Sequence, residues 1–288
     1  MIGRTILITS ALFVAYLGAR PALGQRAATY TAFTLTRQLT AYDAAGDTTP
    51  VMSLTVYASS GGGWHQVGSY STGQTFEEVF IPGKGVFLAD HVNERLMLMG
   101  AVAMGQPCII TAEQLRSDPK FVRTEYVLGH LAYMLREEMN GYLYETYYAP
   151  EFSPFPLKKI TYHGDYKWVD EPLSLTVGEP DAAQVSGPAY PLDEVRAVID
   201  NKLNDRILEK PEPLLPPSSR PGRRARTVLL QVYADESGRV MMVGVVVSIP
   251  RLEQAAVDAA YRARFSPKLV DGKPIKTMGL LKYVFTSQ

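Results

Sequence analysis

The C-terminal stretch 228–286 contains a predicted hairpin, helix and final strand in that order, and this order restricts the fold more than any other feature of the sequence. Residues 228–234 and 239–247 are apolar and rich in β-branched residues, and they flank the turn sequence Asp-Glu-Ser-Gly, which is typical of a β-hairpin. Pro250 suits the first position of a helix, and small apolar residues then recur at spacings of three and four as far as Ala263. A terminal strand follows over 277–286. The stretch therefore predicts a compact ββαβ unit.

Four short sequences that punctuate this stretch are similar to those of the C-terminal domain of TonB. Asp-Glu-Ser-Gly-Arg-Val separates the first two strands, Leu-Glu-Gln-Ala-Ala-Val-Asp-Ala-Ala lies on the helix, Arg-Phe-Ser-Pro follows the helix, and Asp-Gly-Lys-Pro precedes the last strand. The resemblance covers about a fifth of the chain. It implies a small periplasmic protein-binding domain without catalytic residues, which takes up an extended segment of an outer-membrane transporter as an added strand. The alternative is a hairpin and helix of some other α+β domain.

The resemblance also implies where a partner binds. A sheet made of a hairpin and one further strand leaves two edges, and the family resemblance places the partner's strand along the terminal strand. We therefore expect a partner-binding edge strand that contains Thr277, Gly279, Leu281 and Tyr283. A proline at Gly279 or Leu281 is expected to weaken binding if the lost N–H points outward, and to destabilise the fold if it points inward. The expected partner is a protein or peptide, with an outer-membrane transporter and a second copy of the chain both open.

The N-terminus has the features of a secretory signal peptide. Arg4 precedes an apolar run over 6–17, and Ala22 and Gly24 place small residues before a cut at Gln25. The run is shorter than the roughly 20 residues that span a bilayer, although an uncleaved anchor is the alternative. We expect a signal peptide over 1–24 and a periplasmic or secreted protein with no stable membrane span after cleavage. Neither the anchor nor the long spacer of TonB is evident, so energy coupling to an inner membrane stays open.

Composition and charge favour two modules. The chain has 288 residues, 46% of them hydrophobic, and a formal net charge of zero, which is ordinary for globular protein, and the length allows two domains. Residues 1–185 carry 13 Lys and Arg against 18 Asp and Glu, whereas residues 186–288 carry 16 against 11. This mild asymmetry falls well short of a nucleic-acid-binding signature, so no nucleic-acid partner is expected.

Residues 27–185 alternate aromatic and branched residues with Thr and Ser between turn signals, which predicts an antiparallel β-rich domain. The predicted strands include 30–39, 51–57, 64–70, 75–81 and 86–88. The stretch from Phe121 to Gly129 resembles a segment of secreted bacterial proteins of unknown function, and the cadence of the strands resembles the curved sheet of LolA-like lipoprotein carriers. The alternative function is therefore a lipid or lipoprotein carrier that uses the N-terminal curved sheet. The fold class expected for the whole chain is α+β.

Between the two domains, residues 186–226 are predicted to form a helix and a proline-rich connector. Apolar residues at helical spacing predict the helix over 192–203, and Tyr190-Pro191 resembles the dipeptide that opens the first helix of many TonB-type domains. Residues 209–226 contain five prolines and are expected to be extended and semi-rigid. Four arginines of the connector either meet an anionic surface or are simply solvated: Arg220, Arg223, Arg224 and Arg226. The TonB-like domain is then 227–288.

The sequence contains no recognisable catalytic, cofactor-binding or metal-binding motif. The four histidines are far apart in sequence and lack a second ligand at metal spacing: His65, His91, His130 and His163. Glu77 and Glu78 are adjacent, so on a strand their side chains point to opposite faces and cannot act on one bond.

Cys108, in an apolar setting, is read as a small buried side chain. The tyrosines of 142–148 are read as half-buried strand residues, with a ligand platform as the alternative. A hydrolase with a dispersed site is the remaining rival.

Overall fold

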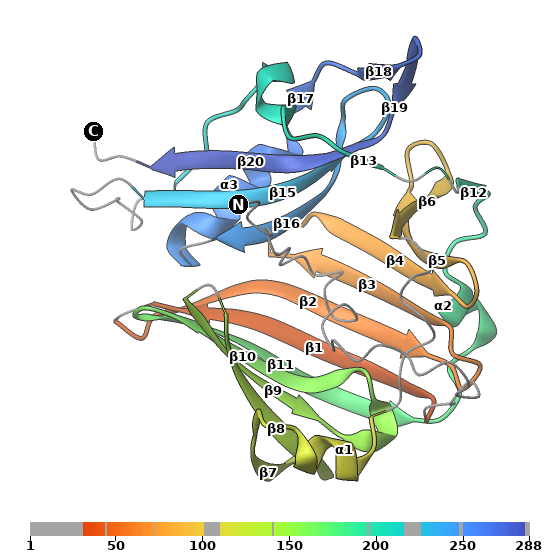
Figure 1. The fold of residues 1–288 in the computed structure, drawn as a ribbon, viewed down its shortest axis with the longest axis vertical. Helices are drawn as coiled ribbons and strands as arrows, with labels where there is room; N and C mark the ends of the chain where they lie inside the picture. The colour runs from red at the N-terminus through yellow and green to blue at the C-terminus, as the bar shows by residue number, and fades with distance from the viewer. Residues whose placement is uncertain are drawn as a thin grey trace. The chain divides into compact units, whose positions relative to one another are not determined.

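The computed structural model describes residues 31–43, 45–71, 73–100, 110–139, 141–193, 195, 197–215, 226–247 and 250–285 (Figure 1). The predicted signal peptide, Cys108 and three of the connector arginines, Arg220, Arg223 and Arg224, lie outside the described residues. The chain divides into two compact units, of which the first ends at Glu194 and the second is Val195–Gln288. Both units are built mainly from strands with few helices, in agreement with the α+β class.

The N-terminal unit is one sheet of twelve strands in the order β12-β6-β5-β4-β3-β2-β1-β11-β10-β9-β8-β7. All neighbours are antiparallel except β12, which runs parallel to β6. The strands are β1 (Phe33–Tyr42), β2 (Thr48–Ala58), β3 (Trp64–Tyr70), β4 (Thr75–Ile81), β5 (Gly85–Asp90), β6 (Arg95–Gly100), β7 (Phe121–Val127), β8 (His130–Met139), β9 (Tyr142–Tyr148), β10 (Pro156–His163), β11 (Tyr166–Val177) and β12 (Leu192–Asp193).

Alternation of side chains along these strands buries one aromatic face. Phe33 lies 5.3 Å from Phe152 and 5.4 Å from Phe155 between ring centroids, and Phe155 meets Trp64 edge to face. Trp64 in turn stacks on Phe80 of a neighbouring strand. Offset and edge-to-face ring pairs of this kind stabilise a core beyond the area that they bury. The strands β1 and β11, which come from opposite ends of the unit in sequence, pair with each other. Both ends of the unit therefore contribute to one core.

Short helical segments pack on this sheet. The helix α1 (Ala112–Ser117) packs on β7 and β8 and begins with a capping box at Thr111. The helix α2 (Ala182–Ser186) packs on β2, β3 and β4, and the 3-10 turn η2 (Pro150–Phe152) places Phe152 in the core. The edge strand β7 carries the charged residues Arg123 and Glu125, a usual way to protect a sheet edge.

The C-terminal unit is a four-stranded sheet in the order β13-β20-β15-β16, with one helix packed on it (Figure 1). The hairpin strands β15 and β16 are antiparallel, β20 is antiparallel to β15, and β13 is parallel to β20. Two further two-stranded ladders, β14-β17 and β18-β19, accompany the sheet. The elements are β13 (Val198–Ile199), the 3-10 turn η3 (Leu203–Arg206), β14 (Ile207–Glu209), β15 (Arg226–Ala234), β16 (Val240–Val247), α3 (Pro250–Tyr261), β17 (Arg264–Phe265), β18 (Lys268–Val270), β19 (Lys273–Ile275) and β20 (Thr277–Phe285).

The core of this unit follows from the register of the two long strands. Leu230 of β15 lies opposite Leu281 of β20, and Val228 lies opposite Tyr283, so these side chains share one face of the sheet. All four are buried, as are Ala256 and Ala260 of α3. Small alanine side chains let the helix approach the sheet closely. The predicted order of hairpin, helix and terminal strand is present, with β17, β18 and β19 inserted between the helix and the last strand.

The helix predicted over 192–203 was wrong. Residues 192–193 and 198–199 form the short strands β12 and β13, and only 203–206 make a helical turn. The branched residues Val198 and Ile199 suit extended backbone. The extended form also gives these residues backbone hydrogen bonds to β6 and β20, which an isolated helix of this length would not outweigh.

The boundary between the units also differs from the expected connector. We expected 186–226 to separate the domains, but the C-terminal unit begins at Val195, and its residues 198–199 and 207–209 pair with β20 and β17. Residues 211–215 have no regular secondary structure, in keeping with their prolines. The proline-rich stretch thus falls in the sequence between β14 and β15 of the C-terminal unit, and its residues 216–225 lie outside the described residues.

Candidate partner-binding edge

The strand β20 is flanked by β15 over its whole length but by β13 only at its start. Thr277 and Met278 pair with Val198 and Ile199, and beyond Met278 none of the described strands pairs with the outer side of β20. A strand side without a ladder partner presents N–H and C=O groups to an added strand. The outer side of 279–285 is therefore the candidate partner-binding edge.

Even-numbered residues supply the outward backbone groups of this edge. The carbonyls of Lys276 and Met278 accept hydrogen bonds from the backbone N–H groups of Val198, at 2.9 Å, and Asp200, at 2.8 Å. The next two outward carbonyls are bonded by side chains instead. Asn204 Nδ2 donates to the carbonyl of Leu280 at 2.8 Å, and Lys210 Nζ donates to the carbonyl of Lys282 at 2.8 Å.

The residues named from the sequence therefore lie on β20, at positions whose backbone groups face β15. Because the N–H and C=O of a strand residue point to the same side and alternate along the chain, the odd-numbered residues bond to β15. Their side chains are also buried, with Leu281 fully so. These residues bond to β15 and pack in the core, whereas an added strand would meet the backbone of Leu280, Lys282 and Val284. The odd-numbered set is Thr277, Gly279, Leu281 and Tyr283.

A buried carboxylate fixes the segment that runs along the start of this edge. Asp200 is 4% exposed and receives hydrogen bonds from Arg206, whose Nε lies 3.0 Å from Oδ2, and from Lys268, whose Nζ lies 3.3 Å from Oδ1. Burial alone would raise the pKa of Asp200, but the hydrogen bonds from Arg206, the Lys202 backbone and Lys268 hold it below its ordinary value. The ionised carboxylate thus joins residues 200–206 to the β17–β18 region.

Gly279 allows this segment to approach β20 closely. A Cβ at position 279 would lie 2.7 Å from the carbonyl oxygen of Asp200 and 2.8 Å from Leu203 Cβ. Neither atom belongs to the free end of a flexible side chain. Leu203 itself is 1% exposed, so the contact with Gly279 is part of the packed interior. Glycine is required here by space rather than by backbone conformation.

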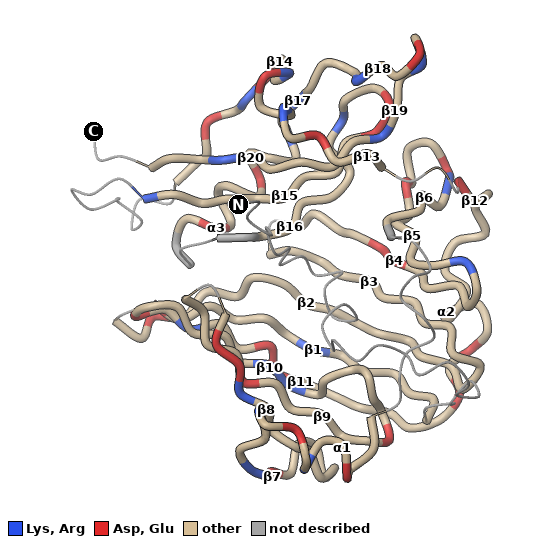
Figure 2. Tube along the Cα trace, in the orientation of Figure 1, with Lys and Arg blue, Asp and Glu red and all other residues tan. Residues whose placement is uncertain are grey.

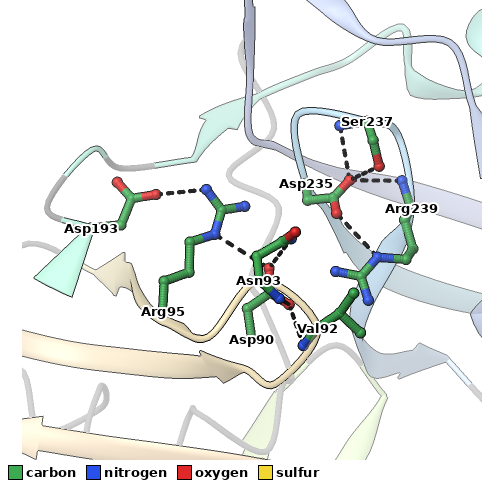
Figure 3. Close-up of polar contacts among 8 residues, drawn as sticks. All are labelled: Asp90, Val92, Asn93, Arg95, Asp193, Asp235, Ser237 and Arg239. Carbon is green, nitrogen blue, oxygen red and sulfur yellow. Dashed lines mark hydrogen bonds and ion pairs between the residues drawn. The ribbon is translucent and has the colours of Figure 1, made fainter. Parts of the chain in front are cut away.

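The turn Asp235-Glu236-Ser237-Gly238 is a structural anchor (Figure 3). The buried Asp235 Oδ1 accepts from the N–H groups of Ser237 and Arg239, each at 2.9 Å, and from Ser237 Oγ at 2.6 Å, while Oδ2 accepts from Arg239 Nε at 3.1 Å. A Cβ at Gly238 would lie 1.8 Å from the carbonyl oxygen of Phe265, and the Phe265 N–H donates to the Gly238 carbonyl. Two of the sequence motifs that suggest the family therefore contact each other directly.

Figure 3 also shows a comparable anchor within the N-terminal unit. Asp90, fully buried, accepts from the N–H groups of Val92 and Asn93 and from Asn93 Nδ2. Arg95 bridges Asp90 and Asp193, with 3.3 Å to the first carboxylate and 3.0 Å to the second. This bridge holds the β5–β6 turn and the parallel strand β12 together.

The fold brings together two of the dispersed histidines. Nε2 of His65 lies 2.7 Å from Oε1 of Glu77, and Nε2 of His91 lies 2.9 Å from Oε2 of the same carboxylate. Nδ1 of His65 also contacts the carbonyl of Gln184, and Nδ1 of His91 lies 3.2 Å from the Tyr190 hydroxyl. The hydrogen bond with His65 is the main reason that the pKa of Glu77 lies below its ordinary value. Nothing in the sequence indicated this cluster, because the pairing of β3, β4 and β5 brings together residues that are far apart in the chain.

Glu78 is on the opposite face of β4, as its neighbouring position requires. It is fully buried, and its Oε2 accepts from Gln66 Nε2 at 2.7 Å on the adjacent strand. Burial raises the pKa of Glu78 to about 7. Glu78 is thus a titrating group of the core. Glu77 and Glu78 have separate surroundings, in agreement with the expectation that they cannot act on one bond.

The tyrosines of β9 divide between two faces of the sheet. Tyr142 stacks on Tyr144 at 6.1 Å and on His163 at 4.2 Å, and Lys159 Nζ lies 4.8 Å above the Tyr144 ring. Tyr147, on the other face, accepts from Arg123 at 3.1 Å. The four tyrosines therefore do not form one platform, and those of 142–144 are packed mainly against neighbouring side chains.

The described residues contain no group of three or more His, Cys, Asp or Glu side chains arranged to hold a metal ion. Within the same residues, no helix has the length and apolar character that crossing a bilayer requires.

Comparisons with known proteins identify the C-terminal part of the chain. Residues 211–286 match the family of Gram-negative bacterial TonB protein C-terminal domains, as the sequence motifs predicted. No curated protein matches the sequence. The match begins after β14, so β13, Asp200 and Arg206 lie outside it, whereas Lys268 lies within it.

Several solved structures resemble the chain at low identity. MucB in complex with MucA(peri) has 16% identity and a TM-score of 0.33, covering 68% of this chain and 64% of that chain. The Pseudomonas aeruginosa MucA/MucB complex has 15% identity and a TM-score of 0.35, covering 90% of each chain. A LolA superfamily protein from Nitrosomonas europaea has 7% identity and a TM-score of 0.27, covering 54% and 90%. Similarity at this level assigns no function to the chain.

Proposed function

We propose that this protein is a non-catalytic periplasmic binding protein whose C-terminal unit takes up an extended segment of a partner protein as an added strand on the outer side of β20. The main support for this proposal is the edge of β20. The ladder with β13 stops at Met278, and among the described residues the outward carbonyls of Leu280 and Lys282 accept hydrogen bonds from side chains only. Main-chain hydrogen bonds give strand addition much of its affinity, and pockets for alternate side chains give its specificity.

The family match supports the same proposal from a different direction. TonB-type C-terminal domains are protein-binding modules of the periplasm, and the match covers β15, β16, α3 and β20. The predicted signal peptide would deliver the chain to that compartment. An outer-membrane transporter is accordingly the partner class that we propose. Detection of a mature N-terminus near Gln25 in the periplasmic fraction, by mass spectrometry, would support the location.

A binding experiment on the full mature chain tests strand addition. The probes are fluorescent peptides Thr-Val-Xaa-Val-Thr-Val-Xaa-Val, in which Xaa is Glu, Gln or Lys, and binding is read by anisotropy. Leu280→Pro removes an outward N–H and should abolish binding while the fold remains, because the side chain is only half-buried and β15 does not use that N–H. Lys282→Pro should behave in the same way.

Folding controls separate loss of the edge from loss of the domain. Circular dichroism and thermal unfolding should show folded proline variants at 280 and 282. If both variants are folded and bind the probes as wild type does, strand addition at β20 is excluded. Concentration-dependent sedimentation of the free protein, with pairing lost in the same variants, would instead identify a second copy of the chain as the occupant of this edge.

A further inference from the structure

The outer side of β20 has a fixed part and a detachable part. At the fixed part, Val198 and Asp200 donate through their backbone N–H groups, and Asp200 is buried and paired with Arg206 and Lys268. At the detachable part, the donors are the side chains of two exposed residues, Asn204 and Lys210. Hydrogen bonds from exposed side chains contribute little net stability, because water competes for both partners.

The segment that carries these two side chains is held on both sides of Asn204 and just before Lys210. Ile207 and Glu209 pair with Phe265 and Arg264 in the β14–β17 ladder, and the Ser266 N–H donates to the Arg206 carbonyl at 2.7 Å. The side chains of Asn204 and Lys210 can therefore leave the two carbonyls of β20 by rotation alone, without unfolding of the segment. Their rotation would leave the carbonyls of Leu280 and Lys282 available to an incoming strand.

Two exposed lysines, Lys210 and Lys282, lie along this edge, and the charge of one acidic residue, Glu212, reaches Tyr283. The C-terminal unit from Val195 onward carries 16 Lys and Arg against 9 Asp and Glu, and Figure 2 shows both kinds of residue on its described strands and loops. Residues 277–285 include Lys282, which is exposed, and no acidic residue. The Lys210 ammonium lies 5.0 Å from the centre of the Tyr283 ring, so it stays close to the edge when its bond to the Lys282 carbonyl is broken.

We infer that Asn204 and Lys210 are removable caps of the β20 edge, which an incoming extended peptide replaces, and that the released Lys210 ammonium together with Lys282 selects peptides with acidic side chains. The inference rests on the proposed function and adds its regulation and its partner chemistry. Before binding, the caps satisfy the outward carbonyls, which would otherwise invite aggregation through the bare edge. On binding, backbone N–H groups of the partner take over both carbonyls, and a carboxylate of the partner takes over the ammonium.

The full mature chain and the three peptide probes test this inference. Asn204→Ala removes one cap and should tighten binding of the neutral Gln probe about fivefold, since one modest hydrogen bond no longer competes. Lys210→Met removes the other cap and the ammonium, so the preference for the Glu probe over the Gln probe should fall severalfold. Lys202→Met, an exposed lysine of the same segment, is the matched control and should leave that preference unchanged.

The outcomes separate this inference from the proposed function. If Leu280→Pro abolishes binding but Asn204→Ala and Lys210→Met bind all probes as wild type does, strand addition stands and the removable caps are refuted. If the Lys probe binds as tightly as the Glu probe, selection of acidic peptides is refuted. If no probe binds any variant, including the uncapped ones, the proposed function itself fails. Tighter binding to Asn204→Ala, with loss of the acidic preference in Lys210→Met, supports the inference.

Discussion

At the scale of single residues, the backbone N–H and C=O groups of β20 alternate in direction, and this alternation decides which of them a partner can reach. The carbonyls of Leu280 and Lys282 point to the outer side, and Gly279 and Leu281 bond to β15. Leu281→Pro should therefore destabilise the C-terminal unit by about 3 kcal/mol or more, whereas Leu280→Pro should leave most of its stability. Urea unfolding of the two variants checks this. Equal stability of both would contradict the assignment of the Leu280 N–H to the outer side and the Leu281 N–H to the β15 side.

Gly279 has a second role, because residues 200–203 pack directly over it. Gly279→Ala places a methyl group 2.7 Å from the Asp200 carbonyl oxygen and should cost about 1–3 kcal/mol of unfolding free energy through overpacking. Gly61→Ala is the matched control, because its new Cβ would meet only Ser59 Oγ, at 3.7 Å. Comparable losses in the two variants would mean that the close packing is not present in solution.

Asp200 makes stability depend on pH at the acid end. Its pKa is lowered in the folded state despite burial, so its contribution is fully present above the unfolded pKa of about 3.9 and is lost as pH falls through the folded pKa. Asp200→Asn should cost about 1–3 kcal/mol at neutral pH, since Arg206 and Lys268 lose a charged partner. It should also flatten the acid limb of the stability profile, measured by denaturant unfolding across pH. A steep acid limb that persists in the variant would assign that limb to other groups.

At the scale of elements, β4 presents two glutamates with opposite behaviour. Glu78 keeps its proton in the fold up to about pH 7, while in the unfolded chain it loses it near pH 4.5. Folding therefore retains a proton that the unfolded chain releases, and stability should fall between these two values as pH rises, by up to about 3 kcal/mol. Glu78→Gln should remove this fall. Thermal unfolding at a series of pH values is the measurement, and an unchanged profile would show that Glu78 is ionised in the fold.

The elements differ in how far their sequences predict them. The hairpin, α3 and β20 were predictable, because alternation, Pro250 and the Asp235 turn all point to the same local structure. The segment around Val198 and Ile199 was not, because its apolar spacing fits a helix while its partner strand β20 lies far away in sequence. The His65–Glu77–His91 cluster was equally hidden. The terminal strand β20 could be predicted from the sequence, but Asn204 and Lys210, which donate to its outward carbonyls, belong to that unpredicted segment.

At the scale of the whole molecule, the C-terminal unit begins before the matched family region. Residues 195–210 contribute β13, the Asp200 cluster and the packing over Gly279. A fragment 195–288 should therefore unfold at a clearly higher temperature than a fragment 227–288, since the shorter one leaves Lys268 without Asp200 and exposes Gly279. Calorimetry of both fragments decides the point. Equal unfolding temperatures would mean that residues 195–210 are a simple connector and do not stabilise the unit.

The central claim is that a partner adds a strand to the outer side of β20. Amide hydrogen exchange of the full mature chain, followed by NMR with and without the Glu probe, tests it most directly, because each amide along β20 reports separately. The account predicts that the N–H groups of Leu280 and Lys282 become protected about tenfold or more on binding, while those of Gly279 and Leu281, already bonded to β15, change little. Protection confined to β16 or to the N-terminal unit, with Leu280 and Lys282 unchanged, would contradict it.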